Sequence, residues 1–174
     1  MKNTNPIPYV NCKIAADLYH VLKIKNLRNT SYQFMTNHQK RISLAGQIIW
    51  YFRYYRSAHK SGKYRVYLFY DSNNNLVGYG ALRREDRLCI TECVDPNFRR
   101  HGYGKAILME LINIGKSERQ NLLAEIWADN KISSSMHEKF GFKLIQASMH
   151  NGRKLNTYLL DTVKTTCENH PDQK

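Results

Sequence analysis

The stretch Val94–Leu108 constrains the fold of this chain more than any other part of its sequence. It reads VDPNFRRHGYGKAIL, in which an apolar run ends at Val94, Pro96 stops it, and glycines at alternate positions precede an apolar segment with helical spacing. The N–H groups of such a loop can turn inward, and the positive end of the following helix can face an anion. The stretch therefore predicts a strand, an anion-binding loop and a helix in direct succession.

Two widespread nucleotide-binding loops do not match this stretch. The dinucleotide-binding pattern needs a third glycine at the position where this chain has Ile107. The G-x-x-x-x-G-K spacing of the other loop is also absent. We therefore expect the anion to bind on a loop of another type.

The rest of the chain shows patterns typical of helices and strands. Before the loop we expect two helices and three antiparallel strands: Asp17–Leu27, Leu44 to about His59–Gly62, Tyr64–Tyr70, Leu76–Arg83 and Arg87–Val94. After it we expect a helix, a strand, a helix and two strands: Lys105–Ile114, Leu122–Ala128, Ile132–Phe140, Phe142–Ala147 and Leu155–Leu160. This order predicts one mixed α/β domain of three layers over residues 1–164, followed by a polar, frayed tail over residues 165–174.

Two motifs on these elements agree with one known family. Arg99, Gly102 and Gly104 form the pattern Gln or Arg, two residues, Gly, one residue, Gly or Ala, after a strand that ends in Val-x-Pro. Downstream, Asn130 is followed by a small residue three positions later and by the run HEKFGF from position 137. Over about Tyr64–Leu160 the chain therefore resembles the GNAT superfamily of N-acetyltransferases. The resemblance implies a three-layer α+β fold with a central, mostly antiparallel sheet, flanking helices and a splayed strand pair that holds acyl-CoA.

The resemblance also implies where acyl-CoA binds, with acetyl-CoA as the expected co-substrate. Its pyrophosphate is expected on the backbone amides of the loop, and its pantetheine arm beside the end of the preceding strand. The residues that this implies are Cys93, Val94, Arg99, Arg100, His101, Gly102, Tyr103, Gly104, Lys105 and Asn130. The side chains of Arg99, Arg100 and Lys105 would add positive charge near the phosphates, although surface arginines without a role are common.

Two residues are candidates for proton transfer. Strand alternation puts Glu92 on one face with Ile90 and Val94, at the parity where the family often carries an acid that takes the proton of the amine. The alternative is a structural carboxylate paired with a nearby Lys or Arg. His137 stands where many members have a tyrosine that protonates the departing sulfur, and a histidine on the helix surface is the alternative.

The positive charge is concentrated in one segment, since no Asp or Glu occurs between Leu18 and Tyr70. Ten of the 27 Lys and Arg residues lie there, and the other 17 face all 14 acids of the chain. By the resemblance this segment forms the wall of the acceptor site, which favours an anionic acceptor. The expected contacts are Arg28, Asn29, Trp50 and Arg53. A solvated basic face and ordinary packing of the aromatic run WYFRYYR remain the alternatives.

Three functions are compatible with these features. The leading hypothesis is an N-acetyltransferase for a primary amine on a nucleotide-linked or phosphorylated amino sugar or a similar small anion. The second is acylation of an amine on a nucleic acid, such as aminoacyl-tRNA or a modified base. The third is a catalytically idle module that binds acyl-CoA or nucleic acid.

Several classes of protein do not fit the sequence. Cys12, Cys89, Cys93 and Cys167 lack the spacing of a disulfide framework or a zinc site, so we expect no metal. No apolar run approaches the length of a membrane span or a signal peptide, which predicts no membrane partner and a cytoplasmic setting. The sequence does not fix the oligomeric state, and a homodimer is compatible with it.

Overall fold

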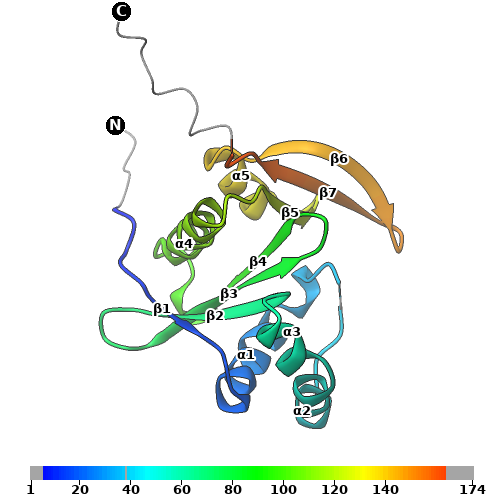
Figure 1. Cartoon of the computed structure of the whole chain (residues 1–174). Helices are drawn as coiled ribbons and strands as arrows, with labels where there is room; N and C mark the ends of the chain where they lie inside the picture. Colours follow the sequence, from blue (N-terminus) through cyan, green and yellow to red (C-terminus); the bar gives the residue numbers. More distant parts are fainter. Residues whose placement is uncertain (1–5, 38, 164–174) are drawn as a thin grey trace, which may run out of the picture.

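A seven-stranded mixed sheet forms the centre of the computed structural model, which describes residues 6–37 and 39–163 (Figure 1). The strand order is β1-β2-β3-β4-β5-β7-β6. The strands are β1 Asn11–Ile14, β2 Tyr64–Tyr70, β3 Leu76–Arg84, β4 Leu88–Val94, β5 Leu122–Trp127, β6 Lys143–His150 and β7 Arg153–Leu160. Neighbours pair antiparallel except β4 and β5, which are parallel. The predicted mixed, mostly antiparallel sheet is confirmed.

The parallel pair separates partway along its length. Its register runs from Leu88 opposite Leu122 to Ile90 opposite Ala124 and then stops. Both strands continue, β4 to Val94 and β5 to Trp127. The sheet therefore contains the splayed strand pair that the resemblance implied, and the inner edge of β4 is free of β5 beyond Ile90.

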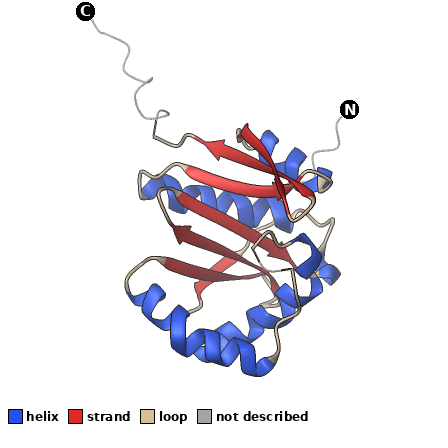
Figure 2. Ribbon diagram, turned by 90° about the vertical axis from the view of Figure 1, so that its right-hand side faces the viewer, coloured by secondary structure: helices blue, strands red, loops and turns tan. Residues whose placement is uncertain are grey.

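Helices cover both faces of the sheet (Figures 1 and 2). On one side lie α1 Leu18–Thr30, α2 Leu44–Trp50 and α3 Arg56–Lys60, and on the other α4 Tyr103–Ser117 and α5 Lys131–Lys139. A π-helical turn, η2 Tyr51–Tyr55, joins α2 to α3, and two short 3-10 turns are η1 Tyr32–Phe34 and η3 Pro96–Phe98. Each side of the sheet has its own apolar cluster, which gives three layers.

Side-chain caps explain where the two N-terminal helices begin. The Asp17 side chain accepts a hydrogen bond from the N–H of His20, and the predicted cap Ser43 accepts one from the N–H of Gly46. Both bonds satisfy a donor in the first turn, which lacks a partner within the helix. The helix predicted from Leu44 to about His59–Gly62 forms, with the π-helical turn inside it.

The sequence prediction differs from the structure at a few points. The predicted elements are all present, and most boundaries agree within three residues. The strand β1 was not predicted, because its four residues are mostly exposed and form an edge against β2 without apolar alternation. The helix α4 begins at Tyr103, two residues earlier than expected, directly after Gly102, which stands at the N-cap position in the left-handed conformation. The tail predicted over residues 165–174 lies outside the described residues.

Candidate functional site

A cleft of about 1550 Å³ opens where β4 and β5 separate. Its lining comes from both sides of the sheet. On one side are residues of the 99–105 loop and of α5, including Gly102, Lys105, Ser133 and Met136. On the other are residues of α1, α2 and the segment between them, including Arg28, Met35, Gln47 and Trp50. A chain-like donor and an acceptor can therefore meet from opposite ends at the splayed strands.

The loop before α4 presents a row of amides to this cleft. Arg100 has φ of 65° and Gly102 has φ of 88°, so both adopt the left-handed conformation. The N–H groups of the five residues from Arg100 to Gly104 donate no hydrogen bond to any described residue. Successive free amides at a helix N-terminus form a concave site for an anion. The loop thus fits a diphosphate.

The side chains of the loop differ in availability. Arg99 is already engaged, because its Nη2 donates to Ser31 Oγ at 2.7 Å and its Nε to the Val94 carbonyl at 3.4 Å. Arg100, His101 and Lys105 line the cleft. Tyr103 packs edge to face on Phe98 and is not among the lining residues.

The end of β4 contributes backbone and an acid to the cleft. Cys93 and Val94 both line it, while the thiol of Cys93 points toward α1, where it lies 3.7 Å from the Leu27 carbonyl. Burial raises the pKa of Cys93, which keeps this thiol protonated. Glu92 points to the opposite face, as strand alternation predicted, with Oε1 3.5 Å from Ser133 Oγ. Its side chain is 13% exposed and lines the cleft.

His137 lies behind Glu92. It is fully buried, packs edge to face on Phe142, and is not among the residues that line the cleft. Its Nδ1 lies 2.9 Å from the Ser133 carbonyl, which can only accept, so Nδ1 carries a proton. Its Nε2 then faces Glu92 Oε1 at 3.6 Å. The structure brings the two candidate proton-transfer residues together and gives His137 a contact with Glu92 in place of direct access to the cleft.

Asn130 holds the start of α5. Its Oδ1 accepts a hydrogen bond from the N–H of Ser133 at 3.3 Å, and the residue lines the cleft. This cap places Ser133 and, one turn later, His137 on the side of α5 that faces Glu92. Asn130 therefore has a structural bond that the motif alone did not reveal.

The four expected acceptor contacts separate into two groups. Arg28 and Trp50 line the cleft, and Trp50 stacks on Tyr55 with ring centroids 5.0 Å apart. Asn29 instead holds α1 to the segment before α2, because its side-chain amide both donates to and accepts from the backbone of Ile42 at 2.8 Å. Arg53 is exposed on η2 and is not a lining residue. The helix positions of Arg28 and Asn29 differ by one residue, which turns their side chains apart.

Sequence reasoning missed several residues on the acceptor side. These are Arg41, Gln47, Tyr64, Tyr79, Arg83 and Glu125. Burial raises the pKa of both Tyr64 and Tyr79, so their phenols remain neutral hydrogen-bonding groups. The acceptor end thus combines aromatic rings with several arginines and one carboxylate. The odd-numbered residues of β3 and β4 point to the acceptor side of the sheet. Strand alternation could have predicted this from the sequence once that face was assigned to the acceptor.

The described part of the chain shows neither a membrane span nor a metal centre. None of its helices combines the length and hydrophobicity that crossing a bilayer needs. Among the same residues, no three His, Cys, Asp or Glu side chains gather in a way that could hold a metal ion.

Comparison with known proteins identifies relatives of this fold. The model of the acetyltransferase (GNAT) family matches residues 23–142. No curated protein matches the chain. Among solved structures, an N-acetyltransferase of Staphylococcus aureus Mu50 has a TM-score of 0.70 at 20% identity, covering 88% of this chain and 99% of that one.

Two further structures carry ligands. The YncA protein of Salmonella typhimurium, solved with its cofactor acetyl-CoA, has a TM-score of 0.70 at 18% identity and covers 95% of this chain and 98% of that one. Spermidine N-acetyltransferase of Vibrio cholerae, solved with CoA and spermine, has a TM-score of 0.74 at 12% identity, covering 87% and 94%. At these identities the likeness concerns the fold.

Proposed function

The chain belongs to the acetyltransferase (GNAT) family of acyl-CoA-dependent N-acetyltransferases, and we propose that it transfers an acetyl group from acetyl-CoA to a primary amine on a small anionic molecule. One observation carries the proposal. The free amides of the 100–104 stretch, all of whose residues except Tyr103 line the cleft, and the carboxylate of Glu92 border the same cleft, so a bound diphosphate and a base serve one site.

The 99–105 loop binds the donor in this proposal. Its free amides hold the pyrophosphate, and Arg100 and Lys105 add positive charge. The free edge of β4 at Cys93 and Val94 can pair with the amide groups of a pantetheine arm, as an added strand would. Arg99 supports the loop from behind through Val94 and Ser31.

Glu92 is the proposed base. Acetyl-CoA supplies an activated thioester, and the attacking amine must lose a proton as its nitrogen bonds to the acetyl carbon and the carbon–sulfur bond breaks. Glu92 takes that proton, directly or through one water, and returns it to solvent. Because a thiol has an ordinary pKa of about 8.5, the CoA sulfur can leave as a thiolate and needs no acid to protonate it.

His137 acts through Glu92 in this proposal. With its Nδ1 proton held by the Ser133 carbonyl, the ring turns Nε2 toward Glu92 Oε1. A proton on the carboxylate makes this contact attractive, so the buried ring stabilises the state of Glu92 that forms during the reaction. His137 is therefore a positioning residue, and burial keeps it from protonating the sulfur itself.

The acceptor is proposed to carry phosphate and a ring. Arg28 and Arg41 supply positive charge at the acceptor end, where Arg83 is already paired with Glu85 at 3.0 Å, and Trp50 and Tyr64 supply aromatic surface. A nucleotide-linked or phosphorylated amino sugar has both features and a primary amine. The V. cholerae neighbour binds spermine, a cation, which the arginine-rich lining of this cleft does not favour.

A nucleic-acid-bound amine is the second candidate. The observation that favours it is the exposed side of the α2–α3 helix, where Arg53 and Arg56 stand beside Phe52, which is 56% exposed. Cations next to exposed rings suit a polynucleotide that extends beyond the cleft. An idle acyl-CoA-binding module is the third candidate, motivated by the absence of the usual tyrosine at position 137.

The deciding experiment measures CoA release from acetyl-CoA with a panel of amines. The panel contains glucosamine 6-phosphate, a UDP-linked amino sugar, spermidine and an aminoacyl-tRNA. We expect turnover with a phosphorylated amino sugar. Silence across the panel despite acetyl-CoA binding in calorimetry would support the idle module.

Two matched arginine variants separate a small acceptor from a polymer. Arg28→Met removes a charge inside the cleft, and Arg53→Met removes one outside it. For a small acceptor, only Arg28→Met should raise the KM of the acceptor. An equal effect of Arg53→Met, with binding that weakens steeply as salt increases, would favour nucleic acid.

A further inference from the structure

The segment between α1 and α2 borders the cleft but has little regular structure of its own. Ser31, Phe34, Met35 and Thr36 line the cleft, and the regular structure among the segment's described residues, 31–37 and 39–43, is one short 3-10 turn, η1. We call residues 31–36 the acceptor wall. Such a segment keeps its place only through bonds to other parts of the fold.

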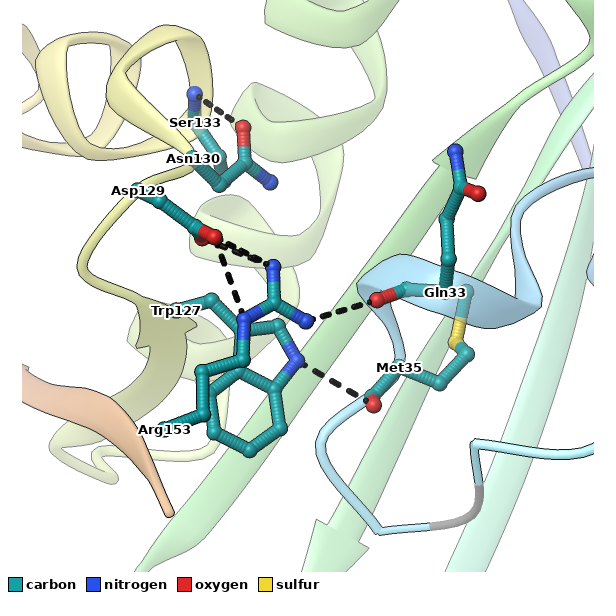
Figure 3. Close-up of polar contacts among 7 residues, drawn as sticks. All are labelled: Gln33, Met35, Trp127, Asp129, Asn130, Ser133 and Arg153. Carbon is teal, nitrogen blue, oxygen red and sulfur yellow. Dashed lines mark hydrogen bonds and ion pairs between the residues drawn. The ribbon is translucent and has the colours of Figure 1, made fainter. Parts of the chain in front are cut away.

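One of these bonds comes from the far end of the chain (Figure 3). Arg153, the first residue of β7, donates from Nη1 to the carbonyl of Gln33 at 2.9 Å, across 120 positions of sequence. The same guanidinium donates two hydrogen bonds to the carboxylate of Asp129, from Nη2 at 2.7 Å and from Nε at 3.2 Å. Its plane lies over the ring of Trp127, with 4.6 Å from Cζ to the ring centroid.

Trp127 supports the wall at a second point. Its Nε1 donates to the carbonyl of Met35 at 3.2 Å, and its ring is fully buried. Arg153 and Trp127 thus hold two carbonyls of the wall, two residues apart, and they also pack on each other (Figure 3). At the other end of the wall, Arg99 of the donor loop holds Ser31.

Asp129, the acid in this cluster, is connected to Glu92 through the start of α5. Asp129 precedes Asn130, which caps α5 through Ser133, and Ser133 contacts Glu92. Hydrogen bonds from Arg153 hold the pKa of Asp129 below its usual range, so the carboxylate stays charged at neutral pH. Arg153 therefore joins the acceptor wall to the start of the helix that carries the partners of Glu92.

We propose that Arg153 is a positioning residue for the acceptor, which fixes the distance between the acceptor wall and Glu92. This inference rests on the proposed function, because it assigns the 31–36 segment to the acceptor. A guanidinium suits the task, since its planar fork can bond Asp129 and a carbonyl at once while stacking on an indole. A lysine has one nitrogen and cannot make all of these contacts together.

The first test needs no acceptor and uses hydrogen exchange of the whole protein. Arg153→Met keeps an apolar stem against Trp127 and removes the fork, and Lys154→Met removes the neighbouring exposed charge as a control. We expect exchange in residues 31–36 to accelerate about tenfold in Arg153→Met, equivalent to about 1.4 kcal/mol, and to stay unchanged in the control. Unchanged exchange in the wall, or equal acceleration in β2 and β3, would overturn the proposal.

The second test separates acceptor from donor. With glucosamine 6-phosphate as the acceptor probe, Arg153→Met should raise the acceptor KM about tenfold, while the Kd of acetyl-CoA changes less than about twofold. The acceptor KM of Arg153→Lys should lie between those of the wild type and Arg153→Met. Equal losses for donor and acceptor would indicate a general structural role and contradict the proposal. Failure of the wild-type protein to acetylate this probe would count against the proposed acceptor, while the exchange result still decides the role of Arg153.

Discussion

The Nε2 atom of His137 lies 3.6 Å from Oε1 of Glu92, so the two candidate proton-transfer residues are in contact although 45 positions separate them in the sequence. The buried ring stands on the helix side of the carboxylate, and the carboxylate borders the cleft. In the proposed mechanism, Glu92 therefore meets the acceptor and His137 supports Glu92.

Replacing Glu92 with glutamine should remove the base and keep the shape. We expect Glu92→Gln to lower kcat/KM about 100-fold or more, because a positioned base contributes about that much. Binding of acetyl-CoA, measured by calorimetry, should not change. Asp86→Asn, which removes an exposed acid from the β3–β4 turn, is the control and should keep full activity. Wild-type activity in Glu92→Gln would show that another group takes the proton.

His137→Phe tests whether the histidine acts through Glu92. Phenylalanine fills the buried site beside Phe142 without offering a lone pair to the carboxylate. We expect kcat/KM to fall about tenfold in the otherwise wild-type protein and to fall no further in a Glu92→Gln background, since residues that act as a unit are not additive. If the two losses multiply instead, His137 serves the reaction independently of Glu92.

Gly102→Ala should weaken binding of the donor. Gly102 has φ of 88°, and an added Cβ would lie 2.8 Å from Cδ of Pro8. A left-handed conformation costs a residue with a Cβ about 1–2 kcal/mol, so we expect the loop to shift and the Kd of acetyl-CoA to rise about tenfold. The control is Gly62→Ala, a left-handed glycine outside the cleft with φ of 70° and no atom within 4 Å of an added Cβ. Calorimetry in which both variants bind equally would contradict the role of the left-handed turn.

Tyr55→Phe should destabilise the fold. The buried hydroxyl of Tyr55 donates to the Ala15 carbonyl at 2.7 Å and accepts from the Val66 N–H at 3.2 Å. Removing it leaves two buried backbone groups with one bond fewer, which costs about 1–3 kcal/mol. Urea unfolding should show the loss as a lower midpoint with an unchanged slope. Tyr54→Phe, at a ring that is 46% exposed, should unfold like the wild type.

The thiol of Cys12 should react slowly in the folded protein. Burial, and secondarily the charge of Glu110, raise its pKa from 9.0 to about 11. Because the thiolate is the reactive form, a shift of about two units lowers its fraction at pH 8 about 100-fold. We expect iodoacetamide labelling of Cys12, followed by peptide mapping, to speed up as pH rises toward 11 and to reach the ordinary rate in urea. Rapid labelling of the native protein at pH 8 would contradict the burial.

Much of the site could be predicted from short stretches of sequence. The Gly102–Gly104 loop, the cap at Ser43 and the facing of Glu92 all depend on residues within a few positions of each other, where backbone geometry and strand alternation decide the outcome. The order of helices and strands followed from the same local patterns, and the family resemblance supplied the arrangement of the sheet.

Other features depend on contacts that local sequence does not encode. Asn29 was expected in the acceptor site, but its amide is used by Ile42, and Arg53 turns outward on a π-helical turn that shifts the helix phase. The bond from Arg153 to the carbonyl of Gln33 was invisible in the sequence, because backbone carbonyls carry no residue identity.

The sequence by itself determined the class of fold, the glycine-bearing turn before α4 and the face of β4 on which the proposed base Glu92 lies, since these depend on neighbouring residues and on spacing. The tertiary structure decided which side chains share the cleft. It placed His137 behind Glu92 and engaged the Asn29 amide with the backbone of Ile42. It also bonded the acceptor wall to Arg153 and Trp127. The physical reason is that each side chain has only a few hydrogen-bond donors and acceptors. Which distant residues bond to them depends on how packing brings remote parts of the chain together.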